Sequence, residues 1–249
     1  MTHHRKSILA AVLAGLLVAA AAQAQGDAAA WRNTVVLYGM GAAIEGTAGM
    51  EDFEVPIDIS ISDLFDSLEM GAMGAYRGEN DTWAVMVDAT FMGLGATQRS
   101  QGGRLKGDIE LDQTTVMGTV GRKLSDHVEA LVGLAWFDLS TELVLDGPLA
   151  TRAGEEGASW IDPTFGLAWH RPIGERWQAD LRADIGGFGI GSNLLVHMLA
   201  DFRWRASERV GVAFGYRLIQ FNYEEGRGAS YESYDLTEQG PLVGVTFSF

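Results

Sequence analysis

The sequence has no cysteine and relatively few basic residues. Lysine and arginine number 18 against 33 aspartates and glutamates in 249 residues, and cysteine is absent. The absence of cysteine excludes disulfides, thiolate metal ligands, cysteine nucleophiles and a lipoprotein anchor. The formal net charge of −15 argues against nucleic acid as a partner, because nucleic-acid binding relies on basic residues that neutralise phosphates.

Long apolar runs are also missing after the first 24 residues. A membrane-spanning helix needs about 18 or more unbroken apolar residues, and no later segment approaches that length. Thirty-two glycines with only five prolines fit a protein of many strands with small residues inside it. No linker rich in proline, serine or charge divides the chain after residue 24, so we expect one domain.

The first 24 residues have the pattern of a secretory signal peptide. Arg5 and Lys6 precede an apolar run from Ile8 to Ala22, and Ala22-Gln23-Ala24 is a small-x-small cleavage site. We predict cleavage before Gln25 rather than retention as a membrane-anchoring helix. Cleavage removes two basic residues and no acidic ones, which leaves the remaining chain more acidic.

The last nine residues alternate between large apolar and small or polar side chains and end on an aromatic residue. In a strand, one face carries Val243, Val245, Phe247 and Phe249, and the other carries Gly244, Thr246 and Ser248. This ending resembles the terminal strand of Gram-negative outer-membrane β-barrel proteins, which typically ends in phenylalanine. The resemblance implies that Phe247 and Phe249 form an assembly signal read by the barrel-assembly machinery.

Four short polar clusters recur between alternating segments, and each looks like a tight hairpin turn. They cover residues 78–81, 122–127, 171–176 and 205–209. Trp83, Trp169, Trp177 and Trp204 lie within a residue or two of three of these clusters. Indole rings prefer the boundary between headgroups and hydrocarbon, so these tryptophans predict a periplasmic aromatic girdle.

Longer and more acidic connections alternate with these turns and are expected to be extracellular loops. They cover about residues 47–68, 98–107, 144–158, 189–193 and 225–230. The predicted strands cover about residues 34–46, 69–77, 82–97, 108–121, 128–143, 159–170, 177–188, 194–204, 210–224 and 231–249. The segment from Phe53 to Leu68 stays open, because its alternating residues fit a strand whereas Ser62 would cap a short helix.

The sequence therefore predicts an all-β, antiparallel transmembrane β-barrel of ten strands, with eight as the alternative. An even number of strands returns the C-terminus to the periplasm. The predicted organisation is a signal peptide over 1–24, a short periplasmic lead-in over 25–33 and the barrel over 34–249.

Charged residues occupy alternate positions in the later strands. They must point into the lumen, because an arginine or lysine facing lipid costs about 2–4 kcal/mol at the membrane midplane. The predicted lumen charge network consists of Asp162, Asp180, Arg182, Asp184, Asp201, Arg203 and Arg217. Both signs lie on neighbouring strands, as expected for ion pairs that fill a narrow lumen.

Other strands are harder to orient. By the same reasoning Trp136, Asp138 and Ser140 are expected to face the lumen, together with Thr164, His170 and His197. The strand over 210–224 carries Gln220 and Asn222 out of phase with Arg217, which predicts a bulge near Leu218. The strands over 34–46 and 108–121 alternate too poorly to orient.

Two interpretations of the lumen remain open. The charges form either a structural polar core, since buried charges need partners, or the lining of a narrow channel for small solutes or ions.

Searches for catalytic and cofactor motifs give no site. The segment Gly186–Gly191 lacks the strand-to-helix context and the Lys-Ser/Thr of a phosphate loop, so it predicts a tight bend. Ten strands resemble the omptin proteases, yet no histidine occurs in any predicted extracellular segment, so that resemblance fails at its central residue. Barrels resembling phospholipases or lipid A deacylases use a Ser/His pair at the lipid-facing surface, for which the inward His197 is a poor candidate. We predict no catalytic residue, cofactor or resident metal, and a rim enzyme is the third alternative.

The predicted outer loops are acidic. They carry Glu51, Asp52, Glu54, Asp58, Asp63, Asp66, Glu69, Asp146, Glu155, Glu156, Glu224 and Glu225. Lipopolysaccharide is also anionic, so close contact would need bridging Ca²⁺ or Mg²⁺, and weak divalent binding is one hypothesis beside plain solvation.

Several segments also resemble a group of small Gram-negative outer-membrane barrels to which no activity is assigned. They are Leu37–Gly39, Ser62–Leu68, Trp160–Pro163, Asp184–Gly189, Tyr234–Leu236 and Gly240-Pro241. The resemblance implies location and fold. We therefore expect a monomeric, non-catalytic barrel with an envelope-structural or surface-interaction role, whose partners are outer-membrane lipid, lipopolysaccharide and the assembly machinery.

Overall fold

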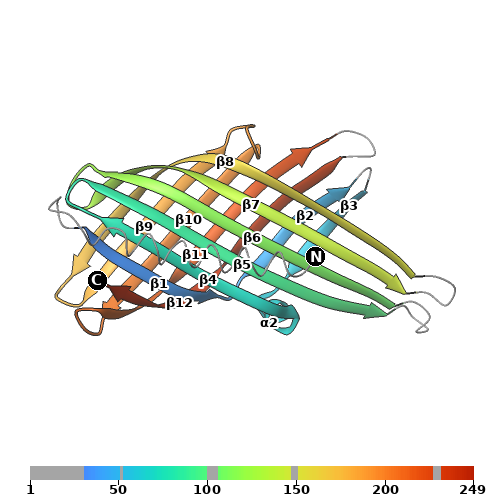
Figure 1. Ribbon diagram of the computed structural model, residues 1–249, viewed down its shortest axis with the longest axis horizontal. Coiled ribbons are helices and arrows are strands. Elements are labelled where there is room, and N and C mark those ends of the chain that lie inside the picture. The colour runs from blue at the N-terminus through green and yellow to red at the C-terminus, as the bar shows by residue number, and fades with distance from the viewer. Residues whose placement is uncertain (1–30, 51–52, 100–105, 147–150, 227–230) are drawn as a thin grey trace.

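The protein is a closed ten-stranded antiparallel barrel with two additional strands. The computed structural model describes residues 31–50, 53–99, 106–146, 151–226 and 231–249. The barrel strands are β1 (Arg32–Met40), β4 (Leu68–Glu79), β5 (Trp83–Arg99), β6 (Lys106–Lys123), β7 (Val128–Asp146), β8 (Thr151–Ile173), β9 (Trp177–Gly187), β10 (Leu194–Arg205), β11 (Val210–Glu225) and β12 (Glu232–Ser248). Neighbours in this order pair, and β1 also pairs with β12, which closes the barrel (Figure 1). The predicted ten-stranded barrel is confirmed, whereas the predicted signal peptide lies outside the described residues.

Four short turns lie together at one end of the barrel, which we call the turn end. Polar side chains close three of them, because they accept hydrogen bonds from backbone amides that have no strand partner. Asn80 Oδ1 accepts from the amides of Thr82 and Trp83 at 2.8 and 2.7 Å. Ser125 Oγ accepts from the Val128 amide, and Ser207 Oγ accepts from the Val210 amide, each at 3.1 Å. Turn chemistry thus fixes the register of the flanking strands.

The N-terminal region adds β2 (Ala43–Met50), β3 (Phe53–Ile59) and the short helix α2 (Ile61–Ser67). β2 continues β1 along β12 after a break at residues 41–42, but its other edge pairs with β3 instead of β4. At the break, a Cβ on Gly240 would lie 1.9 Å from the Gly41 carbonyl oxygen, so only glycine fits there. The predicted loop over 47–68 therefore contains a strand and a helix.

Helix α2 begins after Ser60 rather than at the predicted cap, Ser62. The Asp63 amide donates to Ser60 Oγ at 3.3 Å, and the Ser60 amide donates to Asp63 Oδ2 at 3.2 Å. This reciprocal pair is a capping box in which an aspartate occupies the third helical position. Ser62 lies inside the first turn and only shares a hydroxyl contact with Ser60.

The two faces of the long strands exchange polarity along their length. On β11, Phe214 and Tyr216 are exposed on the outer face while Arg217 is buried inside. Further along, Ile219 and Phe221 are buried on the inner face. Pairing with β10 and β12 continues without a shift, so the bulge predicted near Leu218 is wrong. At this level the lumen changes from a polar filling to an apolar one, as expected if the outer face passes here from lipid to water.

The same exchange explains a second wrong prediction, on β7. Phe137 points inward and is completely buried, whereas the predicted inward residues Trp136, Asp138 and Ser140 lie on the outer face. Trp136 Nε1 donates to Ser159 Oγ on the neighbouring strand at 2.9 Å. Polar side chains at 138 and 140 face out because this part of β7 has passed beyond the apolar belt.

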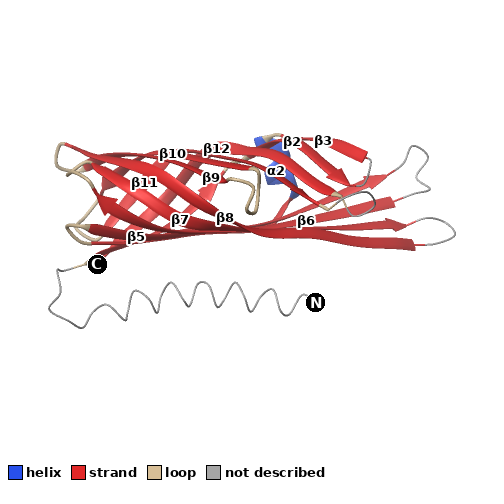
Figure 2. Ribbon diagram, turned by 90° about the horizontal axis from the view of Figure 1, so that it is seen from above, coloured by secondary structure: helices blue, strands red, loops and turns tan. Residues whose placement is uncertain are grey.

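Beyond the level of Trp136 the strands form an outer extension. It consists of the ends of β5, β6, β7, β8, β11 and β12 together with β2, β3 and α2. β9 and β10 have 11 and 12 residues, whereas β7 and β8 have 19 and 23, so the β9–β10 hairpin stops below the extension (Figure 2). The extension is therefore two sheet segments that face each other, one from β5 to β8 and one from β11 through β12 and β2 to β3 (Figure 1).

Helices contribute little to this architecture. Within the described ranges, no helix has the length and apolar character needed to cross a bilayer.

Candidate functional site in the barrel lumen

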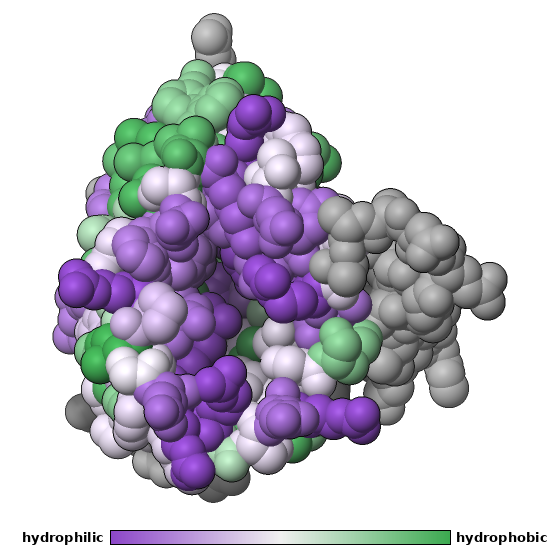
Figure 3. All heavy atoms as spheres, turned by 90° about the vertical axis from the view of Figure 1, so that its left-hand side faces the viewer, coloured by the Kyte–Doolittle hydropathy of each residue, from purple (hydrophilic) through white to green (hydrophobic). Residues whose placement is uncertain are grey.

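The lumen has a polar level toward the turn end and an aromatic level toward the outer extension. Inward side chains of β1, β4, β5 and β7 to β11 supply the polar level. The charges sit at alternate strand positions, as the sequence predicts for β8 to β11. Figure 3 shows the turn end, where hydrophilic residues surround a central hollow.

One group of ion pairs centres on Asp180. Its carboxylate lies 3.1 Å from Arg203 Nε and 2.5 Å from His170 Nδ1, and it accepts from Gln178 Nε2 at 2.7 Å. Arg203 Nε also lies 3.1 Å from Asp201 Oδ1. The arginine therefore lies between two neighbouring carboxylates and reduces their mutual repulsion.

A second group centres on Asp184. Arg182 Nε donates to its carboxylate at 2.6 Å, and His197 Nδ1 lies 2.9 Å from the same Oδ2 atom. Arg182 also donates to Thr119 Oγ1 across the lumen at 2.9 Å. The charge of Asp184 is thus compensated within its own pair of strands, while Arg182 ties those strands to β6.

Arg217 pairs with a carboxylate that the sequence analysis does not identify. Arg217 Nη1 lies 2.9 Å from Asp88 Oδ1 and donates to the Tyr38 hydroxyl at 2.6 Å. Tyr38 in turn donates to Asp88 Oδ2 at 2.9 Å. These partners come from β1 and β5, so Arg217 connects β11 across the lumen to the opposite wall.

Sequence reasoning also misses a third group, near the turn end. Arg77 Nη2 lies 2.5 Å from Glu129 Oε1, and Glu129 Oε2 lies 3.4 Å from His170 Nε2. Arg77 also pairs with Glu79 at 2.8 Å. This group joins β4, β7 and β8 and meets the Asp180 group through His170.

Asp162 lies apart from these groups. Its carboxylate accepts from the Ser192 amide at 2.6 Å, from Ser192 Oγ at 2.7 Å and from Trp160 Nε1 at 3.0 Å. Within the part of the chain that the structure describes, it forms no ion pair. Asp162 therefore fixes the β9–β10 turn to β8 instead of balancing an arginine.

A cavity of about 130 Å³ lies between the charged groups. Within the described segments, four buried side-chain atoms of its lining form no hydrogen bond: His170 Nε2, Asp180 Oδ2, His197 Nε2 and Arg217 Nε. Two of these atoms, Asp180 Oδ2 and His170 Nε2, still lie near an ion-pair partner. A water molecule occupies about 30 Å³ in the liquid, so the space suits a few solvent molecules that satisfy such atoms. The polar level is thus an ion-pair network with room for water.

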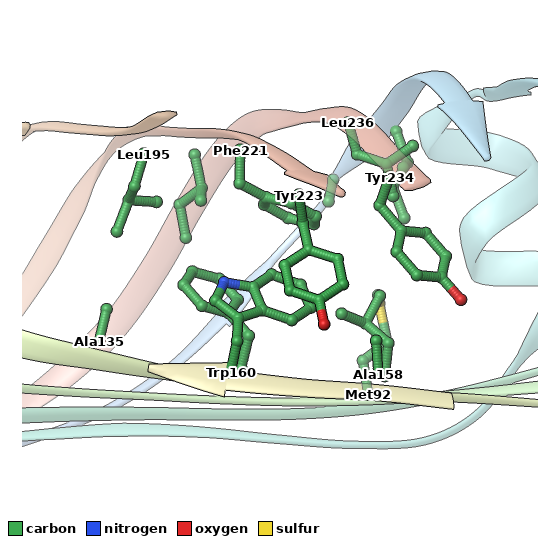
Figure 4. Close-up of a cluster of buried hydrophobic side chains, with 14 of the residues drawn as sticks. Met92, Ala135, Ala158, Trp160, Leu195, Phe221, Tyr223, Tyr234 and Leu236 are labelled. Carbon is green, nitrogen blue, oxygen red and sulfur yellow. The ribbon is translucent and has the colours of Figure 1, made fainter. Parts of the chain in front are cut away.

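Above the cavity, the lumen is filled by an aromatic cluster of Phe137, Trp160, Phe221 and Tyr223 (Figure 4). The ring centroids of Phe137 and Trp160 are 5.1 Å apart, and those of Trp160 and Tyr223 are 4.2 Å apart. Phe137 and Phe221 have no exposed surface. Other residues of the same core come from several further strands and from helix α2. They include Ala42, Ile44, Leu64, Met92, Met117 and Leu195.

The four girdle tryptophans lie near the turn end. Trp83 and Trp177 are exposed on the outer face, and Trp169 and Trp204 are half-buried. Trp177 and Trp204 pair across β9 and β10 with ring centroids 6.5 Å apart. The Arg122 guanidinium lies over the Trp83 ring at 5.2 Å.

The described residues give little support for metal or phosphate chemistry. They include no group of three or more side chains able to hold a metal ion. The glycine-rich segment ends β9 and forms a tight bend, in which Gly187, Phe188 and Gly189 have φ of 87°, 57° and 73°. Several predicted acidic-loop residues, including Glu51 and Asp52, lie outside the described residues.

Comparison with known proteins identifies the fold. No protein-family model and no curated protein sequence matches the chain. The outer-membrane protease OmpT of Escherichia coli matches with a TM-score of 0.57 at 7% sequence identity, over 91% of this chain and 99% of OmpT. The attachment invasion locus protein Ail of Yersinia pestis matches with a TM-score of 0.40 at 11% identity, over 88% of this chain and 98% of Ail. Neisserial surface protein A gives 0.37 at 10% identity, over 90% and 100%.

The match to OmpT places the chain among outer-membrane β-barrels by fold. At such low identity the likeness to OmpT extends to the fold alone. OmpT combines an outer-membrane barrel with protease activity. The fold by itself therefore does not decide whether this chain is an enzyme.

Proposed function

We propose that this protein is a non-catalytic outer-membrane barrel with a sealed lumen, which presents its outer extension at the cell surface in an envelope-structural or surface-interaction role. The aromatic cluster carries the proposal. Phe137 and Phe221 are fully buried between the two sheet segments, where their rings contact each other and Trp160, and Tyr223 stacks on Trp160. An ion that entered from the turn end would have to lose its hydration among packed apolar groups, which is strongly unfavourable.

The polar level supports the same interpretation. Asp88, Asp180, Asp184 and Asp201 each have an arginine within 3.1 Å. Arg203 serves both Asp180 and Asp201, so ion pairs of this kind hold neighbouring strands together and leave none of the four carboxylates without a basic partner. The interpretation as a structural polar core is therefore favoured over the narrow channel.

Catalysis is not supported by the distribution of histidines. His127 lies in a turn, and His170 and His197 lie in the lumen. His3 and His4 belong to the predicted signal peptide, so the sequence places no histidine in the outer extension. A site resembling that of omptins would need one at the outer rim.

Charge distribution supports an orientation with the turns in the periplasm. On the outer extension, acidic residues such as Asp58, Asp138, Glu224 and Asp235 outnumber the basic residues of its strands, which are Arg99, Lys106 and Arg152. Close contact with lipopolysaccharide would then need bridging divalent cations. Calorimetry of the purified barrel that shows neither heat nor a stability change with Ca²⁺ or Mg²⁺ would remove this part of the proposal.

The missing cysteines allow a direct test of surface presentation. We expect Asp138→Cys and Asp235→Cys to react with a membrane-impermeant maleimide on intact cells. Ser207→Cys, in a turn, should react only after the outer membrane is permeabilised. Wild-type protein supplies the unlabelled control because it has no thiol. If Ser207→Cys alone were labelled on intact cells, the orientation would be the opposite of the proposed one, and surface presentation of the extension would be refuted.

A further inference from the structure

Two neighbouring turns carry a cluster of exposed arginines. Arg171 and Arg176 flank the β8–β9 turn, and Arg205 and Arg209 flank the β10–β11 turn. The Arg205 amide donates to the Arg176 carbonyl at 2.8 Å, and the Arg205 guanidinium donates to the Glu175 carbonyl. These bonds tie the two turns together, so the four arginines form one patch, which we call the arginine patch.

The charge of the arginine patch is only partly compensated locally. Across the described ranges, none of the four guanidinium groups forms an ion pair. The two turns also carry Glu175 and Glu208, so positive charges outnumber negative ones by four to two. Four arginines on two adjacent turns, with a net charge of about +2 once Glu175 and Glu208 are counted, attract an anion, and guanidinium groups match phosphate in shape and hydrogen bonding.

Elsewhere on the same rim the basic side chains are already engaged. Arg32 and Lys123 pair with Glu79 at 3.3 and 3.0 Å. Arg122 lies over the Trp83 ring. The arginine patch therefore differs from the opposite side of the rim, around β1, β5 and β6.

An aromatic surface lies directly beside the arginine patch on the lipid-facing side. Trp177 packs edge-on against Phe214 with ring centroids 5.9 Å apart and lies 6.5 Å from Trp204. Phe202 stacks on Phe214 at 5.9 Å. Trp177, Phe202 and Phe214 are each more than 40% exposed, which suits rings that contact lipid acyl chains and the headgroup boundary.

We propose that the arginine patch and this aromatic surface form a binding site for an anionic phospholipid. The phosphodiester binds the arginines, and the acyl chains lie along the rings of β9, β10 and β11. An anionic headgroup is favoured over a zwitterionic one because the patch has excess positive charge, worth about 1 kcal/mol for each basic residue near a membrane surface. Assignment to the inner leaflet rests on the proposed orientation, whereas binding itself does not.

Native mass spectrometry of the full-length barrel tests the site. The purified protein is mixed with equal amounts of phosphatidylglycerol and phosphatidylcholine that have identical acyl chains. We expect retained phosphatidylglycerol to exceed phosphatidylcholine by about thirtyfold, since an excess charge of two at roughly 1 kcal/mol each favours the anionic lipid. Raised salt should reduce the excess.

Variants distinguish a site from general charge attraction. Arg171→Gln, Arg176→Gln and Arg209→Gln together should remove the preference, with Arg205 kept because its guanidinium binds the Glu175 carbonyl. The control, Arg32→Gln with Arg122→Gln, should keep it. If the triple variant does not fold, Arg209→Gln alone should lower the preference by several fold. Equal retention of both lipids by wild type, or equal losses in the patch and control variants, would overturn the proposal without bearing on the sealed lumen.

Discussion

Trp160 and Tyr223 stack with ring centroids 4.2 Å apart and planes 18° apart, although two strands separate β8 from β11 around the barrel. The β9–β10 hairpin ends early, so its last pairs are Thr164 with Gly186 on one side and Leu194 with Asn222 on the other. Beyond these pairs, β9 and β10 no longer fill the space between β8 and β11, so the strands of this hairpin no longer link the two. Side-chain packing joins them instead, and the same packing fills the lumen.

Replacing Trp160 by alanine should therefore destabilise the barrel strongly. Loss of a buried aromatic side chain costs about 3–5 kcal/mol, since a cavity remains where the ring packed. Trp136→Ala is the matched control, because that ring is on the outer face and loses mainly one hydrogen bond to Ser159, about 1 kcal/mol. Denaturant unfolding in lipid vesicles measures both changes. Similar unfolding midpoints for the two variants would contradict the inward packing of Trp160.

Asp162→Asn should loosen the β9–β10 turn. The carboxylate accepts three hydrogen bonds, two of them from Ser192, and an amide in its place keeps the size but loses acceptor capacity. Hydrogen exchange measured by mass spectrometry should show faster exchange in the peptide that contains Ser192. Asp138→Asn, on the outer face of β7, should leave that peptide unchanged. Unaltered exchange in Asp162→Asn would remove the anchoring role.

Arg217 and Asp88 should show strong energetic coupling. Asp88→Leu leaves Arg217 buried without its carboxylate, and removal of one partner from a buried ion pair costs about 3–5 kcal/mol. Arg217→Met together with Asp88→Leu should cost less than the sum of the single changes by about 1–3 kcal/mol. A double-mutant cycle from equilibrium unfolding provides the measurement. Additive effects would show that the pair does not act as a unit.

Removal of Phe249 should impair assembly. The Phe249 amide donates to the Asn33 carbonyl at 2.9 Å, and the Asn33 amide donates to the Phe249 carbonyl at 3.0 Å, so the last residue takes part in closing β12 onto β1. The deletion variant should cross the inner membrane yet show much less heat-modifiable, folded barrel in the outer membrane. Phe188→Ala, an exposed aromatic change away from this closure, should assemble normally. Wild-type levels of folded deletion variant would contradict the assembly role.

Much of the barrel could be predicted from short-range pattern. Turn residues such as Asn80, Ser125 and Ser207 mark the hairpins, and alternation orients β9 and β10 because most of their apolar residues lie on one face and their charged residues on the other. β12 behaves similarly, with Val243, Val245 and Phe247 on the outer face. These strands have one polar and one apolar face throughout the apolar belt, which is the condition that pattern reasoning requires.

The remaining errors arise where one strand passes through two environments. Phe137 and Phe221 are apolar and point inward, because the outer face of their strands meets water beyond the belt. A fixed rule that polar residues face the lumen therefore fails there. Asp88 and Tyr38 are missed for another reason: their importance depends on contact with Arg217 from the opposite wall, which local sequence does not encode.

Ion conductance in planar bilayers tests the sealed lumen most directly. Purified wild-type barrel inserted into a planar membrane should give no stepwise current above that of the bare membrane, because the aromatic cluster fills the lumen above the charged cavity. Steady, reproducible steps in wild-type protein, altered by Arg182→Ala or Arg203→Ala, would contradict the account and establish the lumen as a channel.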